Sequence, residues 1–249
     1  VPGSSSVRIA VVAMGKAGAE ELNYISDVDV IYVAEPTDGG DHDEAMRVGT
    51  KVCAAMARIC SAHTSEGTIW PIDAALRPEG NAGPLVRSLA SCAIYYGKWA
   101  RNWEFQALLK ARPAAGDREL GQAFCDMVSP LVWEAAQRPG FLPDVRAMRN
   151  RVISLIPAKE ADREIKLGVG GLRDTEFTVQ LLQLVHGRGD ERVRARGTFD
   201  ALRALVAFGY IGRDDGADMA RAYRFQRVLE HRVQLRRMRR THLVPDDEP

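Results

Sequence analysis

The sequence has 249 residues, of which 46% are hydrophobic and 27% charged, so it is too apolar for a disordered chain and long enough for one large domain or two small ones. A formal net charge of +1 disfavours a dedicated nucleic-acid binder and gives no attraction to an anionic membrane. No apolar run reaches the roughly 18–20 residues of a membrane span, and the four cysteines form no C-x-x-C pair, so we expect a cytoplasmic protein with reduced thiols. The ends, residues 1–2 and 245–249, resemble cuts in a longer polypeptide.

Short apolar segments near the start of the chain predict three β-strands. Residues 8–14 and 27–34 are rich in β-branched side chains, and glycine ends the first of them. Residues 67–76 predict a third strand, whose proline indicates a sheet edge or a bulge. Between them we expect a glycine turn at residues 15–18 and, from its 3.6-residue periodicity, a helix over 43–63.

Nearly every segment after about residue 88 has the pattern of a helix. The helices are expected at 88–101, 103–111, 117–136, 140–155, 171–187, 198–208 and 214–240. The sequence therefore predicts an α+β fold, with a sheet-containing domain at 1–116 and a helical domain at 117–249.

Two aspartates on the second predicted strand are the strongest chemical signal. Because side chains alternate between the faces of a strand, Asp27 and Asp29 point to one face and Val28 points to the other. Neighbouring carboxylates need a compensating charge, and Mg²⁺ prefers oxygen ligands. If the strand of Asp73 lies beside them, three carboxylates converge, and such a set can hold the two metals of nucleotidyl transfer. A D-x-D pair alone is also common at solvated strand ends.

The first candidate for phosphate binding is the glycine turn after the first strand. Gly15 and Gly18 can present backbone N–H groups to a phosphate, and Lys16 adds positive charge. The spacing is not that of a Walker A loop, so a plain tight turn is an equal alternative. Further basic residues suited to phosphate contacts are Arg77, Arg87, Lys110 and Arg112.

A second candidate is the glycine-rich loop over residues 168–171, which precedes a predicted helix. The N–H groups at a helix start favour anions, and Arg173 lies in the first turn. Asp174 and Glu176 also lie there, and acidic residues suit the helix dipole without any further role. A capped helix start is therefore the competing interpretation.

Four stretches resemble, in this order, the bacterial glutamine synthetase adenylyltransferase/adenylyl-removing family. They are MGKAGAEELNYISDVDVI at residues 14–31, DAALRPEG at 73–80, WEFQALLKARP at 103–113 and IKLGVGGLRDTEFTVQ at 165–180. The resemblance implies a nucleotidyltransferase-type fold, in which a small mixed β-sheet palm with helices is followed by a C-terminal helical bundle. Ala17 and Ala19 stand where the family often has Leu and Gly.

The family has two related halves with opposite activities. One attaches AMP from ATP to a tyrosine of glutamine synthetase, and the other removes it by phosphorolysis and releases ADP. Glu-Leu-Asn-Tyr at residues 21–24 and Lys-Leu-Gly-x-Gly-Gly-Leu-Arg at 166–173 resemble the N-terminal, removing half.

The resemblance also implies ligands and partners. Asp27, Asp29 and Asp73 become the catalytic, metal-binding carboxylates, for Mg²⁺ or Mn²⁺ in a two-metal site. ATP, ADP or AMP is expected at Gly15, Lys16, Ser26, Arg77, Gly170, Gly171 and Arg173. The expected partners are glutamine synthetase as protein substrate, a PII-type signal protein as effector, and the other catalytic half of a longer chain.

Three alternatives remain open at the level of sequence. The chain can be the attaching half, with the same site and the opposite reaction. It can be a docking or regulatory module that is inactive when isolated. It can also be a glycosyltransferase that holds its metal with D-x-D, in which case it should bind a nucleotide-sugar in preference to ATP or ADP.

Overall fold

The computed structural model describes residues 6–246, apart from the side chain of Arg237, and its contacts divide the chain into two compact units. The first unit comprises Val1–Leu22 and Ser26–Val132, and the second comprises Asn23–Ile25 and Trp133–Pro249. Contacts thus group most of the helix that begins at Arg118 with the sheet. The domain limits 1–116 and 117–249 stay a prediction.

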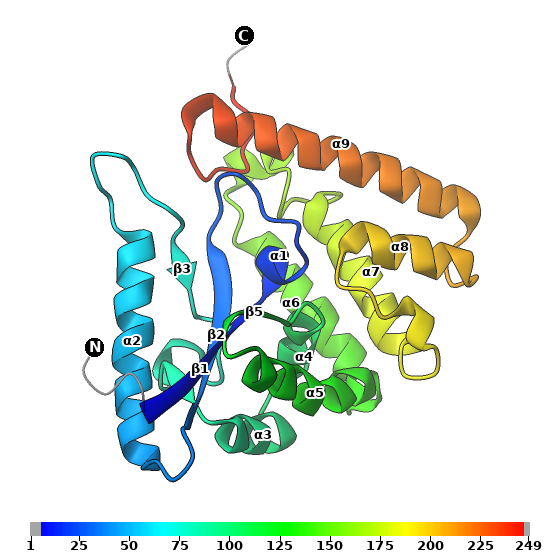
Figure 1. The fold of residues 1–249 in the computed structure, drawn as a ribbon. Helices are drawn as coiled ribbons and strands as arrows, with labels where there is room; N and C mark the ends of the chain where they lie inside the picture. Colours follow the sequence, from blue (N-terminus) through cyan, green and yellow to red (C-terminus); the bar gives the residue numbers. More distant parts are fainter. Residues whose placement is uncertain (1–5, 247–249) are drawn as a thin grey trace. The chain divides into compact units, whose positions relative to one another are not determined.

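A mixed β-sheet forms the centre of the first unit (Figure 1). Strand β1 (Val7–Ala13) lies antiparallel between β2 (Val28–Pro36) and β5 (Arg112–Gly116). The other edge of β2 pairs in parallel with two very short strands, β3 (Ile72–Asp73) near its start and β4 (Val86–Arg87) further along. This sheet, together with the helices, confirms the predicted α+β class.

One face of this sheet is covered by helix α2 (His42–Ser61), which lies alongside β1 and β2 in Figure 1. Alternate residues of β2, namely Val30, Tyr32 and Ala34, share a buried core with α2. Gly49 of α2 allows this close packing, because a Cβ atom there would lie 3.2 Å from the Cβ of Ala34. Because side chains alternate along a strand, the residues of β2 between these three point to the face away from α2.

The remaining helices of the first unit lie on the side of the strands away from α2 (Figure 1). They are α3 (Leu89–Lys98), α4 (Asn102–Leu108) and α5 (Arg118–Glu134). The predicted turn after β1 is a single helical turn, α1 (Gly15–Gly18). A 3-10 turn covers Gly80–Ala82. The predicted helices of this unit are confirmed, with ends that shift by a few residues.

Two parts of the strand prediction were wrong. The third strand is Ile72–Asp73 and not 67–76, because Pro71 has no N–H to extend the ladder and the chain before it turns where Thr64 pairs with Gly67. Strands β4 and β5 were not predicted, since β4 is two residues long and Arg-Pro-Ala-Ala-Gly in β5 contains no β-branched residue. The expectation of an edge strand is confirmed, because β3 ends the strand order.

The second unit is helical. Its α-helices are α6 (Phe141–Ser154), α7 (Leu172–His186), α8 (Thr198–Ala207) and α9 (Arg213–Arg237). Short 3-10 segments cover Ala135–Gln137, Ala158–Arg163 and Glu191–Val193. Buried apolar residues of α7 and α8 form one core, against which residues at the start of α9 pack. The helices are as predicted, and their arrangement as a bundle stays a prediction.

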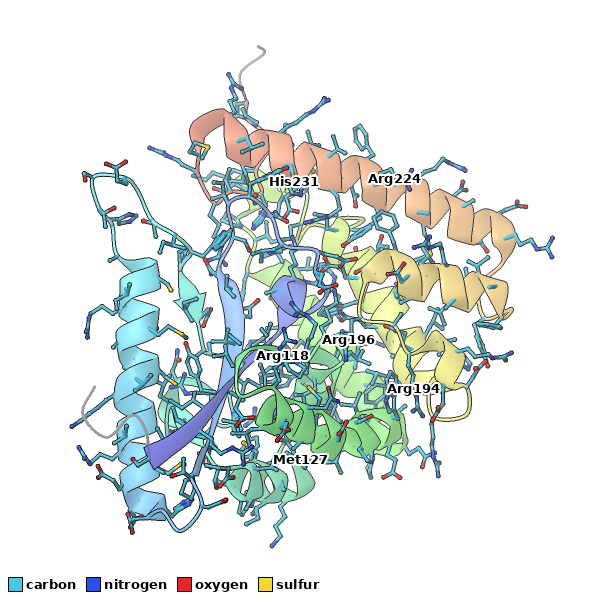
Figure 2. All side chains as sticks on the ribbon, viewed as in Figure 1. Arg118, Met127, Arg194, Arg196, Arg224 and His231 are labelled. Carbon is cyan, nitrogen blue, oxygen red and sulfur yellow. The ribbon has the colours of Figure 1, made fainter. Side chains whose placement is uncertain are left out.

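The side chain of Arg194, labelled in Figure 2, holds the connection that follows α7. Arg194 donates from Nε to the carbonyl oxygen of Gly187 at 2.7 Å, directly after α7. The guanidinium carbon of Arg194 also lies 4.8 Å from the ring centroid of Trp133. None of the helices in residues 6–246 is long and apolar enough to cross a membrane.

Candidate functional site

The D-x-D aspartates lie where β2 meets β3. The backbone N–H of Val28 donates to the carbonyl oxygen of Pro71 at 2.8 Å, which begins the parallel pairing of the two strands. In this register Asp29 is directly opposite Asp73. Register partners in a parallel pair face the same side of the sheet, as Asp29 and Asp73 do here. Strand β2 begins at Val28, one residue later than predicted, so Asp27 lies directly before the strand and not in it. The condition set out in the sequence analysis, that the strand of Asp73 lies beside that of Asp29, is therefore met.

The opposite face of the same strands is apolar. Val28, Val30 and Tyr32 belong to the core beneath α2, and so does Ile72 of β3. The alternation expected from the sequence thus holds on both strands. It separates a packed face from a face on which the carboxylates are only half buried.

Gly15 brings the loop after β1 against one of these carboxylates. Its φ is +51°, in the left-handed region that favours glycine. A Cβ atom at this position would lie 2.5 Å from Oδ2 of Asp29. The backbone N–H of Met14 also donates to the carbonyl oxygen of Asp29 at 2.8 Å. The half-buried Lys16 follows in α1, so a basic side chain belongs to the same loop.

Two basic residues of the stretch at 103–113 bond to the residues that follow β1. Arg112 donates from Nε to the carbonyl of Gly18 at 3.2 Å and from Nη2 to that of Ala17 at 3.0 Å. Lys110 is only 8% exposed and pairs with Glu21 at 3.5 Å. Both residues were candidates for phosphate contacts, and the structure instead gives them internal partners. The sequence shows a basic residue, Lys110, in one stretch and an acidic residue, Glu21, in the other, but no local pattern predicts that they pair.

Arg77 and Arg87 are likewise engaged inside the first unit. Arg77 donates from Nη1 to the carbonyl of Ala74 at 2.8 Å and from Nη2 to that of Gly83 at 3.1 Å, which ties together the loop after β3. Arg87 pairs with Glu79. These contacts brace the segment that carries Asp73, and a role of Arg77 in nucleotide binding stays a prediction.

The carboxylates fit a divalent cation in chemistry and in backbone position. All of the candidate ligand atoms are carboxylate oxygens, which Mg²⁺ and Mn²⁺ accept. Oδ1 of Asp73 accepts a hydrogen bond from the N–H of Ala75 at 2.8 Å, and Asp29 faces Gly15. Within residues 6–246 no three Asp, Glu, His or Cys side chains form a group that holds a metal as they stand. Joint ligation therefore requires side-chain rotation, and the metal assignment stays a prediction.

Ser26 lies directly before the D-x-D pair and bonds to the local backbone. Its Oγ donates to the carbonyl oxygen of Asp27 at 2.9 Å. This bond fixes the serine at the entry to β2. Its predicted contact with a nucleotide is not tested by this arrangement.

The glycine-rich loop before α7 belongs to the second unit, and its N–H groups are already bonded. They donate from Gly170 to Oδ2 of Asp174 (2.7 Å), from Gly171 to Gly168 O (3.1 Å), from Leu172 to Ile165 O (2.9 Å) and from Arg173 to Lys166 O (2.9 Å). In this conformation these four donors are engaged in internal hydrogen bonds. The capped helix start is the interpretation that these contacts support, and nucleotide binding by Gly170 and Gly171 stays a prediction.

Arg173 points into a charged cluster of the second unit. Its Nη1 lies 3.3 Å from Oε2 of Glu176, which is 3% exposed and also accepts a hydrogen bond from the hydroxyl of Tyr223 at 3.2 Å. Burial, helped by the nearby charge of Arg173, lowers the pKa of Lys166. The sequence did not show what Asp174 and Glu176 do. The contacts described for both carboxylates are internal and structural.

Arg149 of α6 holds the glycine-rich loop in place. It donates from Nε to Oδ1 of Asp174 at 2.5 Å, from Nη1 to the carbonyl of Leu167 at 2.7 Å and from Nη2 to that of Gly168 at 2.8 Å. Its side chain is 11% exposed. The hydrogen bond from Arg149 lowers the pKa of Asp174, and the bond from Gly170 adds to the shift.

Replacing Arg149 with Met should lower the free energy of unfolding by about 2 kcal/mol at pH 7, because three partly buried acceptors lose their donor. The folded-state pKa of Asp174 lies below its unfolded value of about 3.9, so this stabilisation is present above that value and is lost as the pH falls through the folded pKa. Urea titrations at pH 7 and pH 3 measure the difference. It should shrink at pH 3, and an equal difference at both values would contradict the explanation. Arg146→Met, an exposed position on the same helix, is the control.

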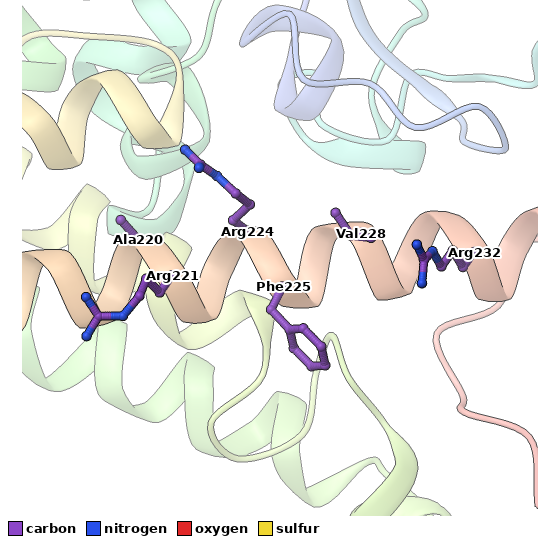
Figure 3. A pocket seen from close by; sticks show the side chains of 6 residues that line it. All are labelled: Ala220, Arg221, Arg224, Phe225, Val228 and Arg232. Atoms are coloured by element: carbon purple, nitrogen blue, oxygen red, sulfur yellow. The ribbon is translucent and has the colours of Figure 1, made fainter.

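A shallow hollow runs along the exposed side of α9 (Figure 3). Its lining residues are Ala220, Arg221, Arg224, Phe225, Val228 and Arg232. Phe225 is 68% exposed, so this helix face is both apolar and basic. The hollow has no acidic or nucleophilic side chain in its lining and offers no chemistry for a transfer reaction.

The mixed sheet and its covering helices define an α+β protein and are consistent with a nucleotidyltransferase-like fold. Comparison with protein families gives the particular family. The model of glutamate-ammonia ligase adenylyltransferase matches residues 2–127, half of the chain, and the chain belongs to this family. The model of GlnD PII-uridylyltransferase matches residues 146–249. The family resemblance seen in the sequence is thereby confirmed.

Individual relatives agree over nearly the whole chain. All three below are named bifunctional glutamine synthetase adenylyltransferase/adenylyl-removing enzyme. The protein of Cutibacterium acnes is 63% identical over 99% of this chain and 25% of its own length. That of Streptomyces avermitilis is 60% identical over 97% and 24%, and that of Mycolicibacterium smegmatis is 56% identical over 99% and 24%. The chain thus spans about a quarter of the length of the curated relatives it matches.

Proposed function

We propose that the chain carries a metal-dependent nucleotidyl-transfer site that removes AMP from an adenylyl-tyrosine of glutamine synthetase. The observation that carries the proposal is the parallel register that sets Asp29 opposite Asp73, with Asp27 two residues before Asp29. The mixed sheet with helices on both sides agrees with a nucleotidyltransferase-type palm. The names of the relatives supply glutamine synthetase as the substrate.

In the proposed reaction an oxygen of inorganic phosphate attacks the α-phosphorus of the adenylyl group in line. The new P–O bond gives ADP, the bond from phosphorus to the tyrosine oxygen breaks, and the phenolate leaves and takes a proton from water. Bound Mg²⁺ supplies neutralisation of the charge on the reacting phosphoryl oxygens. Asp27, Asp29 and Asp73 would hold the cation, and Lys16 on the loop beside Asp29 would attract the anionic phosphate.

The removing direction is supported by residues that flank the site. Asn23 lies in the Glu-Leu-Asn-Tyr stretch that resembles the removing half, whereas the attaching half more often has glycine there. The match of residues 146–249 to a PII-uridylyltransferase supports a PII-type protein as effector. The length of the relatives supports a second catalytic half elsewhere in a longer polypeptide.

The reaction is tested by following the mass of the glutamine synthetase subunit. One sample contains AMP-modified synthetase, phosphate and Mg²⁺, and a second contains unmodified synthetase, ATP and Mg²⁺. Loss of one AMP with release of ADP in the first sample is the expected result. Gain of AMP in the second would keep the site and reverse the direction. No change in either sample, with or without an added PII-type protein, would overturn the proposed activity.

A further inference from the structure

The segment that leads into the D-x-D aspartates is held by helix α9. Residues Asn23–Ile25 group with the second unit, whereas the residues on both sides of them group with the first. We propose that Asn23 is a positioning residue, through which α9 fixes the chain that enters Asp27 and thereby sets the cation affinity of the carboxylates. The bound cation in this inference rests on the proposed function. The attachment of Asn23 to α9 rests on the hydrogen bonds described next.

Both ends of the Asn23 amide are bonded to α9. Its Nδ2 donates to Oε1 of Gln234 at 3.0 Å, and its Oδ1 accepts from Nη1 of Arg227. Asn23 is 3% exposed and Gln234 is 1% exposed, so neither bond is replaced by water without opening the site. An asparagine is required for this pair of contacts, because its short side chain offers a donor and an acceptor together.

The partners of Asn23 are themselves fixed. Arg227 also donates to Glu230, which is fully buried, and the other carboxylate oxygen of Glu230 lies 3.1 Å from Nδ1 of His242. Nε2 of Gln234 donates to the carbonyl of Thr241 at 3.4 Å. A buried network of this kind is rigid because each member needs its partners.

The next residue adds an aromatic contact to the anchor. The ring of Tyr24 meets that of His231 of α9 edge to face, with centroids 5.4 Å apart. His231 is labelled on α9 in Figure 2. Two successive side chains, Asn23 and Tyr24, therefore hold this segment on helix α9. Their partners on α9 lie about one turn from each other along the helix.

Asp27 lies between two fixed points of the chain. The first is the side chain of Asn23, and the second is Val28, whose N–H starts the pairing with β3. Few backbone dihedrals separate the two, so the carboxylate at Asp27 has little freedom of position. Release of Asn23 would free one end of this short span and leave the other bonded.

The test uses Asn23→Ala, Gln234→Ala and the double variant on the 249-residue chain. Hydrogen exchange of peptides covering residues 22–30 should become about tenfold faster in all three. Mn²⁺ affinity, measured by electron paramagnetic resonance without substrate, should weaken about tenfold, as is common when a group that positions a ligand is lost. The effect of the double variant should be smaller than the sum of the two single effects, because the two substitutions share the bond between Asn23 and Gln234.

Tyr223→Phe is the matched control, since it removes another buried hydrogen bond made by α9, the one to Glu176. It should change neither measurement. Unchanged exchange in Asn23→Ala would overturn the anchor. Faster exchange with unchanged Mn²⁺ affinity would overturn the positioning role. If the unmodified chain binds no Mn²⁺, the positioning role and the metal of the proposed function both fail, and the exchange data still decide whether α9 holds the loop.

Discussion

Replacing Asp27 with Ala is expected to lower the turnover of the AMP-removal reaction by about a thousandfold or more, because the cation loses a ligand at the centre of the transfer. The substitution should leave the fold intact. Asp27 is half buried outside the apolar core, and loss of one of two neighbouring like charges removes a repulsion. The free energy of unfolding should therefore change far less than the activity.

The measurement pairs the mass assay with a urea titration of the same preparation. Asp38→Ala, an exposed aspartate in the loop after β2, is the control and should keep full activity. Asp73→Asn should resemble Asp27→Ala, since it keeps the shape and the acceptor for the N–H of Ala75 but removes the charge. An Asp27→Ala variant with near-normal turnover would refute the assignment of the carboxylates as metal ligands.

Replacing Gly18 with Ala is expected to give the largest loss of stability among the glycines of the first loop. The new Cβ would lie 1.9 Å from the carbonyl oxygen of Lys110 and 2.7 Å from that of Ala13. These are backbone atoms, so no side-chain rotation relieves the clash, and the α1 turn must move. We expect the free energy of unfolding to fall by about 3 kcal/mol, at the upper end for overpacking.

Gly97→Ala is the matched control for this change. Gly97 lies inside α3, and a Cβ there would meet nothing within 4 Å. Alanine should stabilise the helix by about 0.5–1 kcal/mol relative to glycine. Urea titrations measure both variants. A Gly18→Ala protein as stable as the unmodified one would show that the close approach of the loop to Lys110 is not needed.

The acidic face was predictable from the sequence because it follows from strand alternation. Alternation in the predicted strand places Asp29 on the face opposite Val28 and Val30, and the structure agrees for these residues of β2, whereas Asp27 lies directly before the strand. Asp73 was recognisable as a charge in an apolar segment. Its position opposite Asp29 depends on which strands pair, which the sequence left as a condition and the structure shows.

Other parts of the site depended on contacts that no local pattern encodes. Arg112 and Lys110 had the residue types of phosphate ligands, yet their donors bond to carbonyls of the first loop and to Glu21. The loop before α7 has glycines typical of an anion-binding loop, yet the N–H of Gly170 donates to the carboxylate of Asp174. In each case an internal acceptor competes for the same donor, and only the tertiary structure shows which acceptor is near.

The short parallel pairing of β2 with β3 also has a consequence for the order of folding. The antiparallel strands β1 and β2 are close in sequence, so they can bring Gly15 against Asp29 with a small loss of loop entropy. Asp73 joins them through a ladder of two residue pairs, after the whole of α2 has intervened. Such non-local contacts form late in refolding. During refolding the chain should therefore regain its helices and its first hairpin before it completes its set of three carboxylates.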